Sequence, residues 1–285
     1  MWLARKEMAR AKGRFGLLIA AIALLVFLIL FQQSLQNALI TSFIGAIRNQ
    51  DAPVLVYAVD GQRVAQGSII TPAQEELIAE APGVGDVGRI GVGTFTARPD
   101  GSVDTFDTTV IGYERGADGN GLGAPATLVE GRLPTADGEA VASDANVDDG
   151  YDIGATITLL PGGLEMTIVG IAEDVQLNVA PTLFTSYDTY VAAVRSVNPD
   201  AGTPLPNVIA VQPADGVSDA EAVDSINAQS LELDALTRDD AAAKTPGVSQ
   251  VEQSFTIIFL LYGLVVPCVT GLFFLIVRPR PRWSP

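Results

Sequence analysis

Residues 15–47 read FGLLIAAIALLVFLILFQQSLQNALITSFIGAI, a run without a single charged side chain. A membrane core about 30 Å thick requires about 20 apolar helical residues, so this run is long enough to cross a bilayer and to continue beyond it. Directly before it lie five basic residues, Arg5, Lys6, Arg10, Lys12 and Arg14. Because basic residues favour the cytoplasmic side, the sequence predicts a membrane helix with a cytoplasmic N-terminus.

A second uncharged run occupies residues 253–277, and Arg278, Arg280 and Arg282 follow it. The two runs predict a multi-pass protein of the plasma membrane with both termini in the cytoplasm and with membrane lipids around both helices. The expected fold class is a membrane protein in which two transmembrane helices with stalk extensions flank a mixed α+β extracytoplasmic domain. The predicted boundaries are 1–14 for a cytoplasmic basic segment, 15–47 for the first transmembrane helix and stalk, 48–247 for the extracytoplasmic core domain, 248–277 for the stalk and second transmembrane helix, and 278–285 for a cytoplasmic tail.

The stalk extensions are predicted from apolar residues that recur at helical spacing. After the first span these are Leu35, Leu39, Ile40, Phe43, Ile44 and Ile47. Before the second span they are Val248, Val251, Phe255 and Ile258. Two such stripes predict stalk helices that bury each other. A cleaved signal peptide is the alternative for the first run, but residues 34–38 (SLQNA) match a cleavage site poorly, so an uncleaved span is favoured.

The middle segment is strongly acidic. The chain has a formal net charge of −16, while residues 1–14 carry +4 and residues 278–285 carry +3, so the segment from Arg48 to Glu252 carries −23. An acidic surface repels nucleic acid and anionic lipid headgroups, which excludes both as partners of this domain. Solvation of the domain explains the charge better than calcium storage or a cationic ligand.

The first part of the middle segment has the pattern of a strand. Residues 53–59 (PVLVYAV) are rich in β-branched and aromatic side chains. Asp60–Gly61 then predicts a hairpin turn into a second strand over residues 62–70.

A helix is predicted next, because Thr71, Pro72 and Gln74 have the pattern of a capping box with proline at the first helical position. This helix is expected to end near Ala81. Further strands are expected over 89–98, 105–113, 155–160, 166–172 and 208–212, and further helices over 185–197 and 219–228. The segment therefore has the composition of a mixed α and β domain.

Missing residue types exclude most catalytic chemistry. The chain has no histidine, which excludes Ser–His–Asp and Cys–His catalysis and the usual histidine-containing zinc sites. Cys268 is the single cysteine, so it cannot form an intramolecular disulfide. No GxxxxGK[ST] phosphate loop is present, so ATP binding would require a partner. The sequence predicts no enzymatic activity and no catalytic, cofactor-binding or metal-binding residue.

Two segments match ligand-binding motifs only in part. Residues 144–150 (DANVDDG) resemble the start of a calcium loop, but the glycine is one position late and Ala155 occupies position twelve. A solvated acidic turn is expected there. Residues 119–123 (GNGLG) contain part of a dinucleotide glycine pattern, without the strand and helix that such a site requires.

Several segments together resemble one known family. They are Leu3–Glu7 with Lys12–Phe15, Glu130–Pro134 (EGRLP) with Gly138–Val141 (GEAV), Ile153–Gly154 with Thr167–Ile171 (TIVGI), and Pro246–Val248 with residues 271–276 (GLFFLI). In this order and spacing they resemble the MacB/FtsX-type permeases of ABC transporters, in particular the DevC-like bacterial members. Ala155 departs from the family, in which an aspartate is common at that position.

The resemblance implies a permease whose extracytoplasmic domain is of the MacB-like periplasmic core type. Members of the family resemble each other in working with a separate ABC ATPase, as homodimers or paired with a second permease. ATP hydrolysis by that partner would move the outer domain through the stalk helices, for export or extraction of a substrate. The glycines and prolines of these segments offer no reactive group, in agreement with a moving element rather than a catalyst.

One departure from the family concerns the C-terminal end. The family usually has four spans and a cytoplasmic segment after the second, whereas residues 277–285 here read VRPRPRWSP. The expectation is a truncated or frameshifted permease. Two alternatives have a similar topology: a two-span regulator of polysaccharide export, and a membrane-anchored sensor or binding protein. The first should contain long helical heptads, and the second should carry a signalling domain after its second span.

Overall fold

The computed structural model of the protein describes residues 12–248, 250–251, 253–258 and 260–261. The chain divides into two compact units, of which one is formed by Leu39–Ser249 and the other by the residues up to Ala38 and from Gln250 onward. Most of the predicted second span, including Cys268, and the predicted cytoplasmic tail lie outside the described residues, as do residues 1–11.

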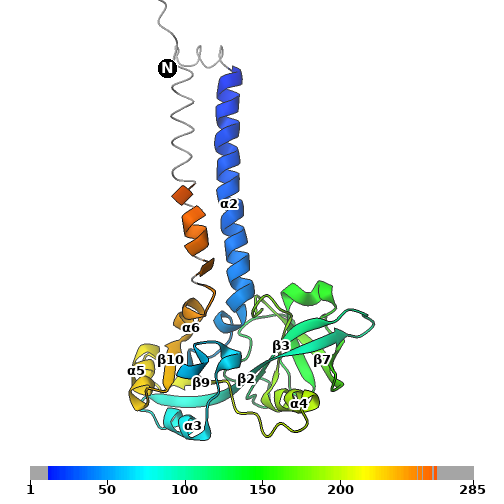
Figure 1. Ribbon diagram of the computed structural model, residues 1–285, viewed down its shortest axis with the longest axis vertical. Coiled ribbons are helices and arrows are strands. Elements are labelled where there is room, and N and C mark those ends of the chain that lie inside the picture. Colours follow the sequence, from blue (N-terminus) through cyan, green and yellow to red (C-terminus); the bar gives the residue numbers. More distant parts are fainter. Residues whose placement is uncertain (1–11, 249, 252, 259, 262–285) are drawn as a thin grey trace, which may run out of the picture. The chain divides into compact units, whose positions relative to one another are not determined.

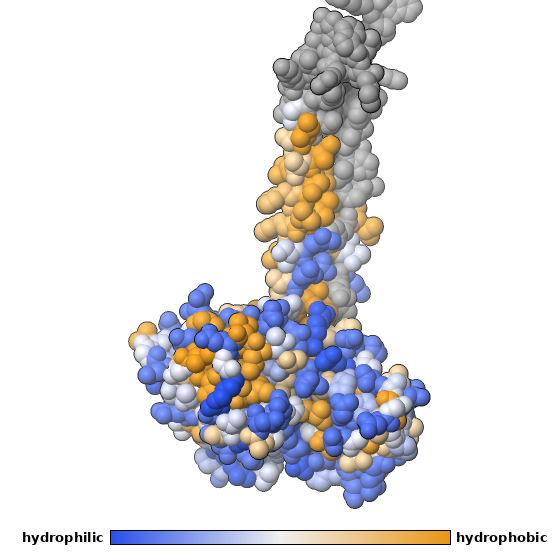
Figure 2. Space-filling view, turned by 180° about the vertical axis from the view of Figure 1, so that it is seen from behind, coloured by the Kyte–Doolittle hydropathy of each residue, from blue (hydrophilic) through white to orange (hydrophobic). Residues whose placement is uncertain are grey.

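Helix α2 (Lys12–Arg48) carries the first apolar run (Figure 1). Among the described residues it is the one helix that is long and apolar enough to cross a membrane, over Ile19–Arg48 with a mean hydropathy of 2.0. Its large apolar side chains are exposed, for example Phe27 at 60% and Leu30 at 59%, and Figure 2 shows them along the described part of the helix. Exposed apolar surface of this kind favours a lipid environment over water.

The predicted stalk stripe is buried only over its last turns. Ile40, Ile44 and Ile47 are buried, whereas Leu35 is 52% exposed. The predicted burial of this stripe against residues 248–258 concerns both units of the chain and stays a prediction.

The chain continues from α2 into a four-stranded antiparallel sheet. Its strands are β1 (Val54–Ala58), β2 (Val84–Pro99), β9 (Val208–Pro213) and β10 (Leu233–Thr237), in the order β10-β1-β9-β2. Helix α3 (Pro72–Ala79) precedes β2, and helix α5 (Asp219–Gln229) precedes β10. This is a split β-α-β arrangement with two β-α-β units. Both helices cover one face, where Ile78 of α3 and Ile226 of α5 share a core with Val54 and Val56.

A second half of the domain is inserted between β2 and β9. It contains β3 (Phe106–Tyr113), β4 (Leu128–Gly131), β5 (Glu139–Ser143), the 3-10 helix η3 (Asp144–Asp149), β6 (Thr156–Leu160), β7 (Leu164–Ala172), β8 (Thr182–Ser186) and α4 (Tyr187–Val197). Strand β6 pairs with both β2 and β7, so β2, β3, β8, β5, β7 and β6 form a closed ring of paired strands. Its interior is filled with apolar side chains such as Val110, Leu159 and Met166, against which α4 packs.

Strand β2 belongs to both halves. Its first residues pair with β9, its middle with β3, and its last residues, Thr96–Pro99, with β6. The two cores are therefore built on one continuous strand.

Eight predicted elements are confirmed: strands β1, β2, β3, β6, β7 and β9 and helices α3 and α5. The capping box of α3 is present, since Gln74 N donates to Thr71 Oγ1 at 3.3 Å and Thr71 N donates to Gln74 Oε1 at 2.9 Å. The predicted helix over 185–197 begins two residues later, because Thr185 and Ser186 end strand β8 and Ser186 caps the helix.

The predicted hairpin at Asp60–Gly61 is wrong. Residues Val59–Gly61 and Ala65–Gly67 form short 3-10 helices, η1 and η2, and β1 pairs with β9 and β10 instead. Both edges of β1 are thus occupied by strands distant in sequence, so the chain must leave the sheet after Ala58. Ser68 Oγ then accepts the hydrogen bond of Ala58 N at 2.8 Å.

Candidate functional site

Two regions of the domain are held by hydrogen bonds or ion pairs between segments distant in sequence: the end of α2 and the loop between β4 and β5. In the first region, residues 173–181 connect β7 to β8 and lie against the last turns of α2. We refer to this connection as the α2-binding loop. Three backbone hydrogen bonds join loop and helix: Ala46 N donates to Gln176 O at 2.9 Å, Asn178 N to Phe43 O at 3.1 Å, and Val179 N to Ser42 O at 2.8 Å. Bonds of this kind use backbone groups alone, so they satisfy N–H and C=O groups of both the loop and the helix.

Gly45 permits this close approach. A Cβ atom at this position would lie 2.2 Å from the carbonyl oxygen of Asp174. The same oxygen accepts a hydrogen bond from Asn49 Nδ2 at 2.8 Å. A side chain at position 45 would therefore push the loop away from the helix.

The α2-binding loop holds a strained backbone in this position. Asp174, Asn178 and Val179 have φ angles of +53°, +55° and +59°. Asn and Asp tolerate the left-handed region, but for the β-branched Val179 it costs about 1–2 kcal/mol. The contacts with α2 offset this cost.

The residues after α2 tie its end to other parts of the domain. The Gln50 side chain is buried, accepting from Ala52 N at 2.6 Å and donating to Ala52 O at 3.0 Å. The backbone carbonyl oxygen of Gln50 accepts a hydrogen bond at 2.8 Å from Nη1 of Arg238, the first residue of helix α6 (Arg238–Lys244). Asn49 O accepts from Ala126 N at 2.9 Å. The end of α2 thus contacts both halves of the domain and continues directly into β1.

An apolar cavity of about 40 Å³ lies beside this junction. It is lined by Ala46 and Ile47 of α2, by Tyr57 and by Phe184, among others. Burial raises the pKa of the Tyr57 hydroxyl above its ordinary value, so this group stays neutral. The cavity has room for about one water molecule, which makes it a packing gap and not a ligand site.

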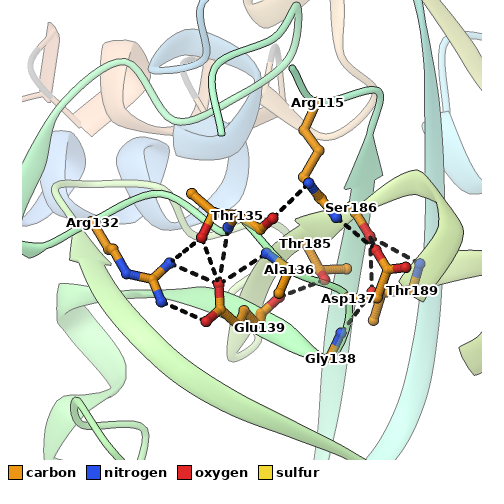
Figure 3. Close-up of polar contacts among 10 residues, drawn as sticks. All are labelled: Arg115, Arg132, Thr135, Ala136, Asp137, Gly138, Glu139, Thr185, Ser186 and Thr189. Carbon is orange, nitrogen blue, oxygen red and sulfur yellow. Dashed lines mark hydrogen bonds and ion pairs between the residues drawn. The ribbon is translucent and has the colours of Figure 1, made fainter. Parts of the chain in front are cut away.

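The second feature is the loop from Gly131 to Glu139, which we call the motif loop (Figure 3). Arg132 and Glu139 form a two-pronged ion pair within it, with Arg132 Nη1 donating to Glu139 Oε2 at 2.7 Å. The same carboxylate accepts from the backbone N–H groups of Thr135 at 2.9 Å and Ala136 at 3.1 Å. The hydrogen bond from Arg132, assisted by these backbone donors, lowers the pKa of Glu139 to about 2.

A second ion pair, together with hydrogen bonds from β8 and α4, fixes the middle of the motif loop to the segment that follows β3. Arg115 Nη2 donates to Asp137 Oδ1 at 2.9 Å, and its Nη1 donates to Thr135 O at 2.8 Å. Ser186 Oγ donates to the same Asp137 oxygen at 2.9 Å, and Gly138 N donates to Thr189 Oγ1 at 3.0 Å (Figure 3). The hydrogen bonds from Arg115 and Ser186 lower the pKa of Asp137.

The motif segments that are separate in the sequence meet in the structure. Gly131 of β4 pairs with Gly170 of β7, and a Cβ on Gly131 would lie 2.3 Å from Val169 O. A Cβ on Gly170 would lie 2.4 Å from Arg132 O. Gly154 N donates to Ile168 O at 2.8 Å. Gly131 and Gly170 allow the two strands and the residue after β4 to pack at backbone distance, which is a structural role.

The family described as the MacB-like periplasmic core domain matches residues 15–229, about three quarters of the chain. The chain belongs to this family. The match includes α2 from residue 15 onward, the motif loop and the α2-binding loop. It confirms the resemblance to MacB/FtsX-type ABC transporter permeases that the sequence motifs indicated.

Solved structures with similarity to this chain include two periplasmic or extracellular domains. The periplasmic region of MacB from Actinobacillus actinomycetemcomitans has 15% identity and a TM-score of 0.47, covering 68% of this chain and 92% of that one. The extracellular domain of the noncanonic ABC-type transporter YknZ from Gram-positive bacteria has 15% identity and a TM-score of 0.41, covering 66% and 100%. No curated protein matches the sequence.

The two partial ligand motifs have structural roles in this MacB-like domain. Residues 144–149 form η3, and Asp144 Oδ1 accepts from Asp174 N at 3.1 Å, which helps to hold the α2-binding loop. In residues 119–123, Gly119 O accepts from Tyr113 Oη at 2.9 Å. Among the described residues, no group of three or more acidic, histidine or cysteine side chains is arranged to hold a metal ion.

Sequence reasoning found the motif loop but missed the α2-binding loop. The irregular backbone of this loop could have been predicted from residues 173–180 (EDVQLNVA), because Asp174 and Asn178 are residue types that favour positive φ. Nothing local in that segment indicates that it contacts a helix more than a hundred residues earlier.

Proposed function

We propose that this chain is a permease component of an ABC transporter in which a separate ATPase moves the extracytoplasmic domain through α2. The observation that carries the proposal is the junction of α2 with the domain, where backbone hydrogen bonds and Gly45 leave the helix end little freedom to slide. A helix bonded in this way can pass a displacement to the domain, because helix and loop move as one body.

The family match supports the proposal, since MacB-like core domains belong to transporter permeases. The chain would cross the plasma membrane twice with both termini in the cytoplasm, and its basic N-terminal segment would contact the ATPase. A homodimer, or a pair with a second permease, would place two such domains side by side. Export or extraction of a substrate would follow from their movement, with ATP hydrolysis confined to the partner.

The alternative of a membrane-anchored binding, sensor or polysaccharide-export protein is not favoured by the family match. It also gives no reason for a junction that fixes the helix end to both halves of the domain.

The proposal can be tested with the full chain in lipid nanodiscs. The chain is first purified from its native membrane, and the co-purifying proteins are identified by mass spectrometry. The recovered ATPase is then added to the chain in nanodiscs. A donor dye is attached to a cysteine introduced at Val103, which is 93% exposed, and acceptor dyes are attached to lipid headgroups. Energy transfer between the dyes reports the distance between the domain and the membrane surface. The label requires a Cys268→Ala background.

We expect an ABC ATPase to co-purify and ATP to change the energy transfer. Gly45→Ala should reduce this change, whereas Gly202→Ala, at a position where a Cβ meets no atom within 4 Å, should not. Absence of any ABC ATPase would contradict the permease function. An ATPase that hydrolyses ATP without changing the energy transfer would contradict the coupling through α2.

A further inference from the structure

An open polar groove runs along helix α4, apart from the junction with α2. It encloses about 690 Å³, within the range of about 300–1,000 Å³ that small-molecule sites occupy. One stripe of α4, made of Asp188, Val191 and Arg195, lines it, and Thr203 lines it beside Arg195. Tyr187 lines it as well.

The segment that contains Thr203 is held to α4 near both ends of the stripe. Arg195 Nη2 donates to Thr203 Oγ1 at 3.1 Å, and Tyr187 Oη donates to Pro204 O at 3.1 Å. The guanidinium of Arg195 is therefore positioned, with further N–H donors left for a ligand.

Three arginines line the groove, but two are already neutralised by acidic side chains. Arg89 forms ion pairs with Glu75 and Glu114, and Arg115 forms one with Asp137. Asp188 and Arg195 differ from them, because neither makes an ion pair with any residue that the structure describes. Among the described residues, Asp188 and Arg195 are thus the two charged side chains of the groove without an ion pair. Arg89 is shared by two carboxylates, so one further negative charge remains on the side of the groove that Glu114 lines.

These two charges lie on the same face of α4 at a defined separation. They are seven residues apart, which at 1.5 Å per residue places them about 10 Å apart along the helix axis. Val191 lies between them and presents an apolar surface to the groove. The order along the stripe is acidic, apolar, basic.

We propose that this groove binds a short zwitterionic peptide, with its ammonium group at Asp188 and its carboxylate at Arg195. An extended chain spans about 3.3–3.6 Å per residue, so a tripeptide matches a separation of about 10 Å. A ligand with only negative charge is disfavoured, because the domain around the groove carries a charge of −23. The assignment is independent of coupling to an ATPase.

The test uses the full chain in detergent micelles and trialanine as the probe, with binding measured by isothermal titration calorimetry. Asp188→Asn and Arg195→Gln should each weaken binding about tenfold or more, because each removes charge-assisted hydrogen bonds. Matched controls are Asp219→Asn, in the first turn of α5 as Asp188 is in that of α4, and Arg98→Gln, an exposed arginine of β2. Both controls should bind as the unmodified chain does.

Two further measurements separate recognition of both charges from simpler binding. N-acetyl-trialanine amide, which has neither charge, should not bind. The charge-swapped double variant Asp188→Arg with Arg195→Asp should bind trialanine again, because the peptide can reverse its direction.

No binding of trialanine, or binding by either single variant as tight as that of the unmodified chain, would overturn the proposal. A second outcome would also overturn it. If acetate binds as tightly as trialanine and Asp188→Asn does not weaken trialanine binding, the groove is a site for anions alone. Both side chains are exposed, so the variants are expected to fold, and thermal melting of each checks this.

Discussion

The α2-binding loop and the motif loop both fix a connection between strands, but they do so by different means. The first is held to α2 by backbone hydrogen bonds and by the missing side chain of Gly45. The second is held by ion pairs of Arg132 with Glu139 and of Arg115 with Asp137. The helix junction should therefore respond to added volume, whereas the motif loop should respond to charge, pH and salt.

The largest effect is expected from Gly45→Ala. The added Cβ would overlap the carbonyl of Asp174, which cannot move without breaking the neighbouring hydrogen bonds, and we expect the free energy of unfolding to fall by about 3 kcal/mol. Hydrogen exchange should accelerate at the amides of Asn178 and Val179. The matched control is Gly202→Ala, for which a change below about 0.5 kcal/mol is expected. Unchanged exchange at both amides would show that the junction is softer than the geometry implies.

The next effect is expected from Glu139→Gln. Gln keeps the shape of the side chain but loses the charge that accepts from Arg132 and from two backbone amides, so the free energy of unfolding should fall by about 2 kcal/mol. Exchange should accelerate at Thr135 and Ala136 and stay unchanged at the α2-binding loop. Equal acceleration in both loops would refute the idea that they are fixed independently.

Lowering the pH should destabilise the unmodified chain as Glu139→Gln does, because protonation also removes the negative charge of Glu139. The pKa of Glu139 is about 2 in the folded protein against an ordinary value of 4.5. A lowered folded-state pKa means that the stabilisation is complete above about pH 4.5 and is lost as the pH falls towards 2. The difference in unfolding free energy between the unmodified chain and Glu139→Gln should therefore shrink between pH 6 and pH 2.5. A difference that persists at pH 2.5 would point to packing and not to charge.

The smallest effect is expected from salt. Arg132 is 50% exposed, so 1 M NaCl, with a screening length of about 3 Å, should weaken its ion pair only slightly. Exchange at Thr135 and Ala136 should rise slightly, while Asn178 and Val179 should not respond. A salt response at the α2-binding loop would show that charges also hold the junction.

Local signals in the sequence were sufficient wherever an element is fixed by its own residues. The capping box at Thr71 located α3, and β-branched residues located β1. Four strands, β4, β5, β8 and β10, were missed. Strand β4 has four residues at the edge of the sheet, and the small residues of β5 (EAVAS) have weak strand propensity.

The pairing of strands was beyond the reach of the sequence. Strand β1 lies between β9 and β10, which begin more than 150 residues after it, and only the folded sheet brings them together. The same limit applies to the site. The sequence motifs contained Arg132 and Glu139 but did not indicate that they pair, because the intervening loop must first fold back on itself.

The way in which the chain passes through β1 and β10 has a mechanical consequence. Val54, the first residue of β1, pairs with Thr237, the last residue of β10, so the incoming and outgoing chains leave the sheet at the same end. A pulling force on the two chains would open this antiparallel pair one hydrogen bond at a time, which is the weak, unzipping direction of loading. Arg238 closes that end, with its N–H donating to Pro53 O and its Nη1 to Gln50 O, both at 2.8 Å. The two hydrogen bonds of Arg238 and the contacts of the α2-binding loop would therefore bear the force first. The hydrogen bonds between β1 and β10 would break only after them.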